Sequence, residues 1–301
     1  MRILIIISII LSCSNFGYAQ KQGNQNSDKN LVVIKVQNSE LSINPEVGAR
    51  IVSLKYLGKE LLSSQAVHSE NFGSTLWTDP QSDWGWPPYD TLDALPYQIR
   101  KRKNEWNFTS KKDKRSGFQI LKKIKPSQKD SSFNITYFIK NISNSKKSVG
   151  AWEVTRVLPG GLSLFPSAPD SSIMADSNLP GVKKIGQIIW FVYDFEKIKS
   201  HAKLFAMGSE GWMAHVVDDI AFIKTFDDVP TPEIVNGQGE IEIYVNGERK
   251  YTEIENHSSH KILKPGETLS YKVKWLVRKL PSNINKFEGS IQLVEFIKSQ
   301  L

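Results

Sequence analysis

Short stretches of alternating apolar and polar residues run through most of the chain. In residues 132–141, for example, every second residue is apolar: Phe133, Ile135, Tyr137 and Ile139. Such alternation predicts a strand that buries one face. Turns rich in glycine, proline, asparagine and charged residues separate these stretches. The pattern therefore predicts an all-β protein built from antiparallel strands.

Helical spacing occurs near the C-terminus, in residues 285–299. The apolar residues of its stripe are Phe287, Ile291, Val294 and Ile297. No repeat of fixed period and no shift in composition marks a domain boundary. We therefore expect residues 31–301 to form a single large β-sandwich with a short C-terminal helix.

The N-terminus looks like an export signal. Arg2 precedes an apolar run over residues 3–11, which is too short to span a bilayer as a permanent helix. Two processing routes fit these residues. Cleavage after Ala19 would remove a signal peptide of residues 1–19, whereas a lipoprotein signal of residues 1–12 would leave a lipid on Cys13.

Residues 20–30 are polar and lack apolar periodicity, so we expect a disordered tether there. The expected location is the periplasm, or the cell envelope through a lipid anchor at Cys13, with no other membrane attachment. Cys13 is the only cysteine of the chain, which excludes disulfides and cysteine metal clusters.

Positive charge is concentrated in residues 100–125. The chain has a net charge of +8, and this segment holds eleven lysines and arginines against Glu105 and Asp113. In an exported protein, the partners that fit are an acidic glycan or an anionic envelope surface, and not nucleic acid. The alternative is a pair of solvated hairpin strands whose lysines prevent aggregation.

Tryptophan is concentrated in residues 73–90, which lack a helical or strand period and contain several prolines and glycines. We expect a long, shaped loop there. Indole rings beside amide and carboxylate groups suit the flat apolar faces and hydroxyl rims of sugars, so Trp77, Gln81, Trp84 and Trp86 are candidate ligand contacts. The alternative is a tryptophan plug over the core.

A second group of candidates lies on the strand of residues 149–157. Because side chains alternate along a strand, Glu153 faces one way while Trp152 and Arg156 face the other. If Trp152 is buried, Arg156 shares its environment and needs an acidic partner. If instead Arg156 lines a cleft, Trp152 lines it too, and both are candidate ligand contacts. Glu153 is either a site residue or an ion-paired carboxylate.

A third group is acidic. Tyr251, Glu253 and Glu255 share one face of a predicted strand, and a hairpin turn would place Glu242 and Glu240 beside them. Facing carboxylates repel and raise one another's pKa, so a cation, an arginine or a proton-transfer role would explain them. The alternative is a solvated acidic face.

Known metal and cofactor motifs are missing from the sequence. His257 and His260 have no third ligand at metal spacing, and His215 lies within a predicted strand. No Walker, Rossmann, G-x-S-x-G or H-E-x-x-H motif occurs. We expect no metal and no cofactor.

The chain resembles the DUF4380 type of exported bacterial proteins, which are similar to the galactose mutarotase-like superfamily. The resemblance rests on short motifs: Gly73-Ser74-Thr75, Trp84-Gly85-Trp86-Pro87-Pro88, Trp152-Glu153-Val154-Thr155-Arg156, Gly211-Trp212, Tyr251-Thr252-Glu253-Ile254-Glu255 and Leu263-Lys264-Pro265-Gly266-Glu267. It implies a β-supersandwich with a carbohydrate cleft over residues 31–281.

In the sugar epimerases of that superfamily, a late glutamate shortly before a Leu-x-Pro-Gly turn is the base, and a histidine on a middle strand is the acid. The resemblance assigns the base to Glu255 or Glu253. Where the histidine would fall, this chain has Glu153 or Thr155.

Three hypotheses follow. The first is a protein that binds a carbohydrate, either an acidic glycan or a free sugar. The second is an aldose epimerase-like or glycan-processing enzyme with Glu153 and either Glu255 or Glu253 as acid and base. The third is a structural envelope protein whose tryptophans belong to the core.

Overall fold

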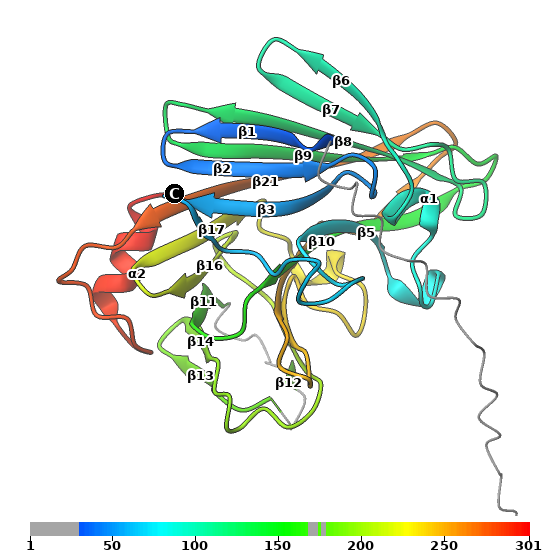
Figure 1. Ribbon diagram of the computed structural model, residues 1–301. Coiled ribbons are helices and arrows are strands. Elements are labelled where there is room, and N and C mark those ends of the chain that lie inside the picture. Colours follow the sequence, from blue (N-terminus) through cyan, green and yellow to red (C-terminus); the bar gives the residue numbers. More distant parts are fainter. Residues whose placement is uncertain (1–29, 168–173, 176–178) are drawn as a thin grey trace, which may run out of the picture.

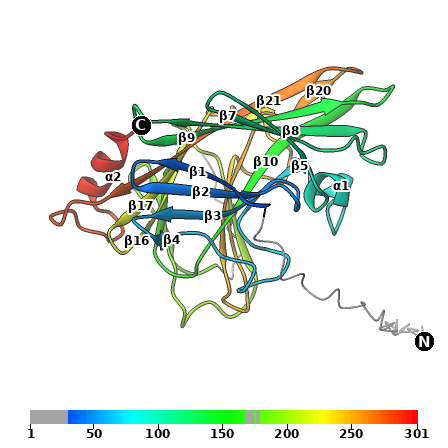
Figure 2. The same ribbon diagram turned by 45° about the horizontal axis from the view of Figure 1, so that its top comes forward.

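The computed structural model describes residues 30–167, 174–175 and 179–301. The expected signal peptide and nearly all of the expected tether lie outside these residues. Within them, the protein consists of two antiparallel sheets and two short α-helices, α1 (Asp90–Asp93) and α2 (Ile291–Lys298), as Figures 1 and 2 show. The predicted all-β supersandwich is confirmed. None of the described helices is long and apolar enough to cross a membrane.

The first sheet, sheet A, has eleven strands. In spatial order they are β1 (Val32–Val36), β2 (Ser39–Asn44), β3 (Arg50–Tyr56), β5 (Ser74–Asp79), β10 (Lys147–Val157), β19 (Thr252–His257), β18 (Ile241–Val245), β15 (Ala202–Ala206) and β12 (Met174–Ala175), with β4 (Lys59–Glu60) beside β3 and β20 (Lys261–Leu263) beside β10.

The second sheet, sheet B, has ten strands. In spatial order they are β13 (Val182–Ile185), β14 (Ile188–Val192), β11 (Leu162–Pro166), β16 (Trp212–Val217), β17 (Ile220–Phe226), β21 (Thr268–Lys279), β9 (Ser132–Asn141), β8 (Phe118–Ser127), β7 (Glu105–Thr109) and β6 (Gln98–Arg102). Two 3-10 turns, η2 (Gln81–Asp83) and η3 (Thr231–Glu233), lie in loops.

The main hydrophobic core lies between the two sheets. The alternating residues of β9 supply one part of it, since Phe133, Ile135 and Ile139 are each at most 1% exposed. Burial of such side chains is the principal stabilising contribution to folding, at about 1.5–3 kcal/mol per large side chain. The polar residues of β9 therefore face outward, as their alternation predicts.

Helix α2 covers one end of sheet B on its outer face (Figure 1). Leu293 and Ile297, one helical turn apart, pack with Ile223 and Leu276 of the sheet. The helix begins at Ile291, later than the helical spacing suggested, because the Ser290 hydroxyl caps it by accepting the N–H of Leu293 at 3.3 Å. The buried stripe of α2 is therefore Leu293 and Ile297, whereas Phe287 and Ile291 of the predicted stripe are exposed.

Residues 73–90 are only partly a loop, so that expectation is wrong for their first third. Residues 74–79 form strand β5, between β3 and β10, and all six residues are buried. A strand that is buried on both faces needs no polar alternation, and its sequence therefore lacks the period of two. The loop proper follows β5 and contains η2 and α1.

Candidate functional site

The candidate site lies on the face of sheet A that is turned away from sheet B. Five neighbouring strands, β5, β10, β19, β18 and β15, place polar and aromatic side chains there. Trp152 of β10 lies opposite Trp77 and His257, and Glu255 of β19 lies opposite Glu242. Because opposed residues of antiparallel strands share a face, residues distant in sequence form one contiguous group.

A cavity of about 500 Å³ opens over this face. Three indole rings line it, those of Trp77, Trp86 and Trp152. Polar side chains complete its lining, among them Gln81, His68, His201, Tyr244, Tyr251, Lys203 and Glu253. Concave sites with aromatic walls and a few convergent polar groups are typical of small-molecule binding.

The tryptophans pack edge to face around Trp77. The ring centroid of Trp77 lies 5.1 Å from that of Trp152, 5.7 Å from that of Trp84 and 5.8 Å from that of Trp86. The indole N–H of Trp77 donates to the Asp93 carboxylate at 2.9 Å, which fixes the ring. Trp86 is 54% exposed and presents its ring to solvent.

Trp84 does not line the cavity, contrary to its candidate role. Its indole N–H donates to the Thr78 carbonyl at 2.8 Å, and its ring packs behind Trp77. It supports the aromatic wall from the rear, as a core tryptophan does.

Lys203 explains how two facing glutamates are tolerated. Its ammonium lies 2.6 Å from Glu242 and 2.9 Å from Glu255, and 4.8 Å from the ring centroid of Trp152. The same Glu255 oxygen accepts the indole N–H of Trp152 at 2.6 Å. Both glutamates are 0% exposed, so they contact the lysine and not the cavity.

Burial and neighbouring charge shift the pKa values in this cluster. Burial raises the pKa of Glu255 to about 7, because the charges of Glu253 and Glu242 add to the desolvation that Lys203 only partly offsets. Burial would lower the pKa of Lys203, but the charges of Glu255 and Glu242 outweigh it and raise this pKa. The lysine is therefore a fixed cation.

His257 is a second buried cation. Its ring stacks on Trp152 at 5.2 Å, with Nδ1 3.3 Å from Asp79 and Nε2 3.4 Å from Glu242. Although burial lowers its pKa, the two carboxylates outweigh this and raise the pKa to about 9. Gly150 permits this arrangement, since a Cβ there would lie 2.8 Å from the Asp79 carboxylate.

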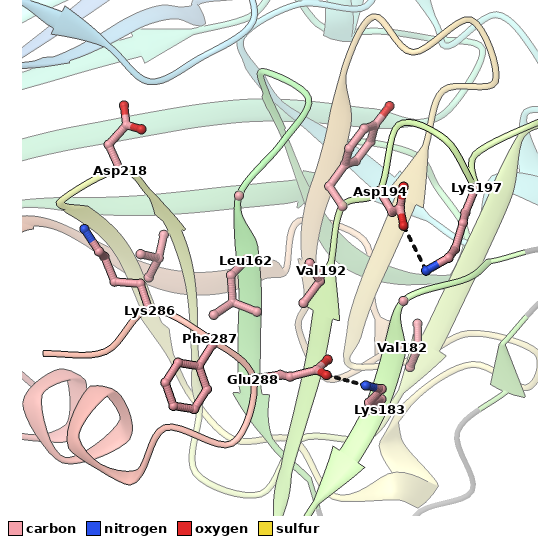
Figure 3. A pocket seen from close by; sticks show the side chains of 14 residues that line it. Leu162, Val182, Lys183, Val192, Asp194, Lys197, Asp218, Lys286, Phe287 and Glu288 are labelled. Atoms are coloured by element: carbon pink, nitrogen blue, oxygen red, sulfur yellow. Dashed lines mark hydrogen bonds and ion pairs between the residues drawn. The ribbon is translucent and has the colours of Figure 1, made fainter.

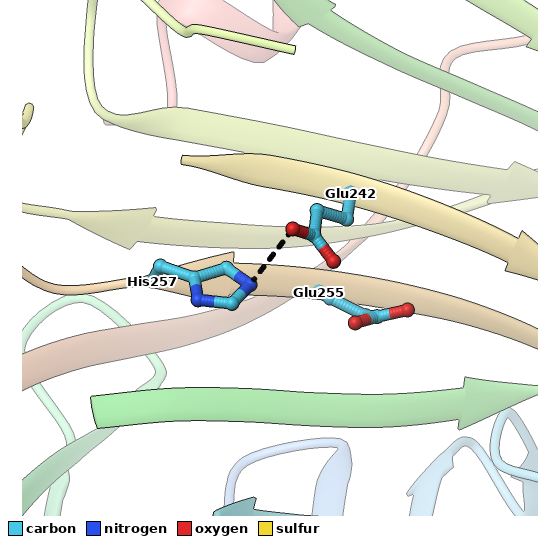
Figure 4. A group of neighbouring side chains, drawn as sticks. All are labelled: Glu242, Glu255 and His257. Atoms are coloured by element: carbon cyan, nitrogen blue, oxygen red, sulfur yellow. Dashed lines mark ion pairs between the residues drawn. The ribbon is translucent and has the colours of Figure 1, made fainter. Parts of the chain in front are cut away.

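Glu242, Glu255 and His257 form the one group of described residues with metal-ligand spacing, with ligand atoms within 4.8 Å of one another (Figure 4). The ammonium of Lys203 already lies between the two glutamates. A protonated His257 has no free lone pair for a metal. The protein's own cations therefore neutralise this acidic group.

Arg156 is 0% exposed and lies behind the aromatic wall. Its Nε is 2.8 Å from Glu253, and its guanidinium lies 5.1 Å from the ring centroid of Trp77. Glu253 is thus the acidic partner that a buried Arg156 needs. Arg156 acts on the cavity only through Glu253 and Trp77, because it does not line the cavity itself.

Glu153 lies on the opposite face of sheet A, so its pairing with Glu255 or Glu253 as acid and base is wrong. Strand alternation directs its side chain into the core between the sheets, where it is 0% exposed. It pairs with the buried ammonium of Lys224 at 2.8 Å and accepts the hydroxyl of Tyr137 at 2.5 Å.

The sequence did not reveal Lys203, His257, Tyr244, His68 or His201 as site residues. The sequence around His257 reads as a turn, whereas His257 is the last residue of β19. Lys203 and Tyr244 occupy ordinary alternating positions on strands, and only the order of strands in sheet A brings them to the cavity. The alternation of residues along β15, which places Lys203 on the half-buried face, is the one feature of the sequence that indicates a role for it.

A larger cavity of about 630 Å³ lies apart from these residues, among β11, β13, β14 and β16 of sheet B (Figure 3). Phe287 lines it, and Lys183 pairs with Glu288 across it. None of the candidate residues from the sequence lines this cavity. Its size alone does not make it the functional site, since no indole ring lines it and four of its charged side chains pair with one another, Lys183 with Glu288 and Lys197 with Asp194.

Comparison with known proteins identifies the family. The family described as "Domain of unknown function (DUF4380)" matches residues 85–278. The chain belongs to the DUF4380 family. That match covers the loop after β5 from residue 85 onward and all of β10 and β19, and therefore most of the site of this DUF4380 chain, but not His68, Trp77 or Gln81. No curated protein matches it in sequence.

Solved structures show what this DUF4380 fold is similar to. A galactose mutarotase-like protein from Lactobacillus casei has a TM-score of 0.61 and 12% identity, covering 83% of this chain and 100% of that one. The Slr1438 protein from Synechocystis sp. has a TM-score of 0.60 and 11% identity, covering 86% and 99%. A putative aldose 1-epimerase from Escherichia coli has a TM-score of 0.53 and 10% identity, covering 83% and 99%. The fold is galactose mutarotase-like.

Proposed function

We propose that this protein binds a saccharide in the cavity between the aromatic wall and strands β15, β18 and β19. The observation that carries the proposal is the set of three indole rings, Trp77, Trp86 and Trp152, around a cavity of about 500 Å³ that also holds polar groups. Indole faces stack on the apolar faces of sugar rings, and polar groups satisfy their hydroxyls. The mutarotase-like fold is consistent with this ligand class.

The histidines of the cavity have the hydrogen-bonding chemistry that hydroxyls need. Nδ1 of His68 accepts the N–H of Asn71 at 2.9 Å, and Nδ1 of His201 accepts the N–H of Gly247 at 3.1 Å. Each neutral ring therefore carries its proton on Nε2 and is a donor there. Burial lowers the pKa of His68, which keeps it neutral. Glu253 supplies a complementary acceptor.

A binding titration against a panel of mono- and oligosaccharides tests this proposal. We expect at least one sugar to bind the wild type, and Trp86→Ala to weaken it by about tenfold or more, because burying a large apolar side chain contributes about 1.5–3 kcal/mol. Phe287→Ala is the matched control, since Phe287 is an equally exposed aromatic residue at the other cavity.

The two variants show which of the two cavities binds the sugar. Weakened binding in Phe287→Ala, with Trp86→Ala unaffected, would move the site to the other cavity. Failure of every sugar to bind would refute the proposal and favour a structural role for the tryptophans.

A catalytic role is the second candidate, and the observation that favours it is that Glu253 lines the same cavity as His68 and His201. Interconversion of sugar anomers requires a base at the anomeric hydroxyl and an acid at the ring oxygen. Glu253 is the base that fits this chain, because Glu255 is enclosed by Trp152 and Lys203.

Anomer exchange followed by NMR on any sugar that binds separates the two candidates. An enzyme would accelerate exchange, and Glu253→Gln would abolish the acceleration while the sugar still binds. A binding protein would leave the exchange rate at its uncatalysed value.

We also propose export, which the apolar run in residues 3–11 supports. Mass spectrometry of the mature protein tests both processing routes. A chain beginning at Gln20 indicates signal-peptide cleavage, and a lipid-modified Cys13 indicates an envelope anchor. An intact Met1 would contradict export.

A further inference from the structure

The outer face of sheet B carries a regular array of cations that the proposed sugar cavity does not use. Helix α2 packs on this face in a cluster with residues of β11, β14, β16, β17 and the end of β21. The remaining strands, β21, β9, β8, β7 and β6, leave their outer residues uncovered, and the β6–β7 hairpin projects from the body of the molecule (Figure 1). All five residues of β6 are exposed.

Strand register sets these cations in a row. Arg100 lies opposite Asn107, which lies opposite Lys123, which lies opposite Thr136, which lies opposite Lys272. Cations therefore occupy alternate strands, with an amide or a hydroxyl between them. Two strand spacings separate neighbouring cations, which is roughly 10 Å.

A second row runs beside the first. Lys125 lies opposite Asn134, which lies opposite Lys274, so the same alternation of cation and amide repeats. Arg102 extends this side of the face, opposite Glu105. On β6, β8 and β21, two cations lie two residues apart, which keeps both on the outer face.

The array has an excess of positive charge. Lys123 pairs with Glu105 at 3.5 Å, and Lys274 pairs with Asp130 at 3.3 Å. The other members form no ion pair within 4.0 Å with a carboxylate of residues 30–167, 174–175 or 179–301; they are Arg100, Arg102, Lys125 and Lys272. Uncompensated cations at this density raise the local concentration of anions.

Part of this face is concave, and some of its cations line the hollow. A cavity of about 410 Å³ lies over β6, β7 and β8, with Arg100, Arg102 and Lys123 among its lining residues. Asn107 and Thr109 line the same hollow and offer hydrogen bonds to hydroxyl groups. An extended chain can enter such a hollow, whereas the surface of a bilayer cannot.

We propose that this face binds an acidic polysaccharide in which a uronic acid alternates with an uncharged sugar. Carboxylates of alternate units meet the cations of alternate strands, and the hydroxyls of the units between meet Asn107 and Thr136. The half-buried Phe138 is the one aromatic side chain of β9 on this face, too few for the stacking that single-stranded nucleic acid uses. This proposal is independent of the sugar cavity.

Titration with hyaluronan oligosaccharides, as the alternating polyuronate, tests the face. We expect wild-type binding that weakens as ionic strength rises, and no binding of neutral dextran. The double variant Arg100→Ser/Arg102→Ser should bind about 3- to 10-fold more weakly, as expected for two exposed charge pairs. The control Lys199→Ser/Lys286→Ser removes the same charge from exposed positions off this face and should bind normally.

Further variants distinguish binding at this face from binding elsewhere on the protein. Lys272→Ser, on β21, should also weaken binding, and it provides a test if the hairpin variant does not fold. Trp86→Ala should bind hyaluronan normally, because it affects only the sugar cavity. Equal loss in the Lys199/Lys286 control would show that net charge alone is responsible and would overturn the proposal.

Competing ligands provide the remaining outcomes. Tighter binding of a short DNA duplex or of phosphatidylglycerol vesicles than of hyaluronan would overturn the proposal in favour of that polyanion. No binding to any of them would leave the cations as protection of the β6 edge against aggregation, and would equally overturn it.

Discussion

Replacing Lys203 by methionine removes the cation that keeps Glu242 and Glu255 together. Methionine is similar in length to the lysine stem, so packing changes little while the ammonium is lost. Removing one partner of a buried ion pair costs about 3–5 kcal/mol. Because the Lys203 side chain is 22% exposed, we expect a loss near the lower end, about 3 kcal/mol in the free energy of unfolding at pH 8.

The pH dependence of this loss identifies its cause. Without Lys203, the folded-state pKa of Glu255 rises further above its value in the unfolded chain. Folded protein then takes up a proton at Glu255, and each unit of pKa shift corresponds to about 1.4 kcal/mol. Stability is therefore retained at low pH and lost as pH rises, so the deficit should be much smaller at pH 5 than at pH 8.

Urea denaturation at both pH values measures this deficit. The double variant Lys203→Met/Glu255→Gln removes a charge of each sign and should recover about half or more of the loss at pH 8. An equal deficit at pH 5 and pH 8, or strictly additive effects of the two substitutions, would refute the role of Lys203 as a counter-ion.

Two further predictions concern buried charges. His257 has a folded-state pKa of about 9, above its ordinary value of 6.5, so its contribution to stability is complete below pH 6.5 and is lost as pH rises through 9. His257→Gln should flatten this part of the stability profile by about 2–3 kcal/mol in thermal or urea unfolding; an unchanged slope between pH 6.5 and 9 would contradict the raised pKa. Glu153→Gln leaves the ammonium of Lys224 without its carboxylate between the sheets. It should cost about 3 kcal/mol of stability in urea unfolding, with sugar affinity unchanged when the folded variant is titrated, and loss of affinity without loss of stability would return Glu153 to the site.

Local patterns in the sequence were sufficient for the fold class. Alternation in β9 and β8 identified strands with one buried face, and the hairpin between β18 and β19 placed Glu242 opposite Glu255. Alternation along β10 also separated Glu153 from Arg156. These inferences depend only on the two-residue period of a strand, which the sequence carries directly.

Strand β5 could not be recognised from the sequence, for a physical reason. Its residues are buried on both faces, and polar ones occur on each, since the Ser74 hydroxyl bonds to that of Thr155 and the Thr75 hydroxyl donates to Asp93. No alternation of polar and apolar residues therefore marks an outer face. The indole rings that follow differ in exposure, from Trp84 packed behind Trp77 to Trp86 in solvent. Composition alone does not separate these two cases.

The composition of the cavity depends on strand order, which the sequence does not state locally. Lys203 reaches Glu255 because β15 lies beside β18, and β18 lies beside β19. His257 reaches Asp79 across β10, a separation of 178 residues along the chain. Such pairings follow from the whole sheet, so the counter-ions of the acidic pair became identifiable only with the structure.

The proposed function requires that a sugar ring occupy the cavity beside Trp86. A crystal structure of the protein soaked with the tightest-binding sugar of the panel tests this requirement most directly. We predict a sugar ring stacked on Trp86 or Trp152 with its hydroxyls within hydrogen-bond distance of Glu253 and His201. Sugar bound only at the cavity beside Phe287, with the cavity beside Trp86 empty, would contradict the proposed function.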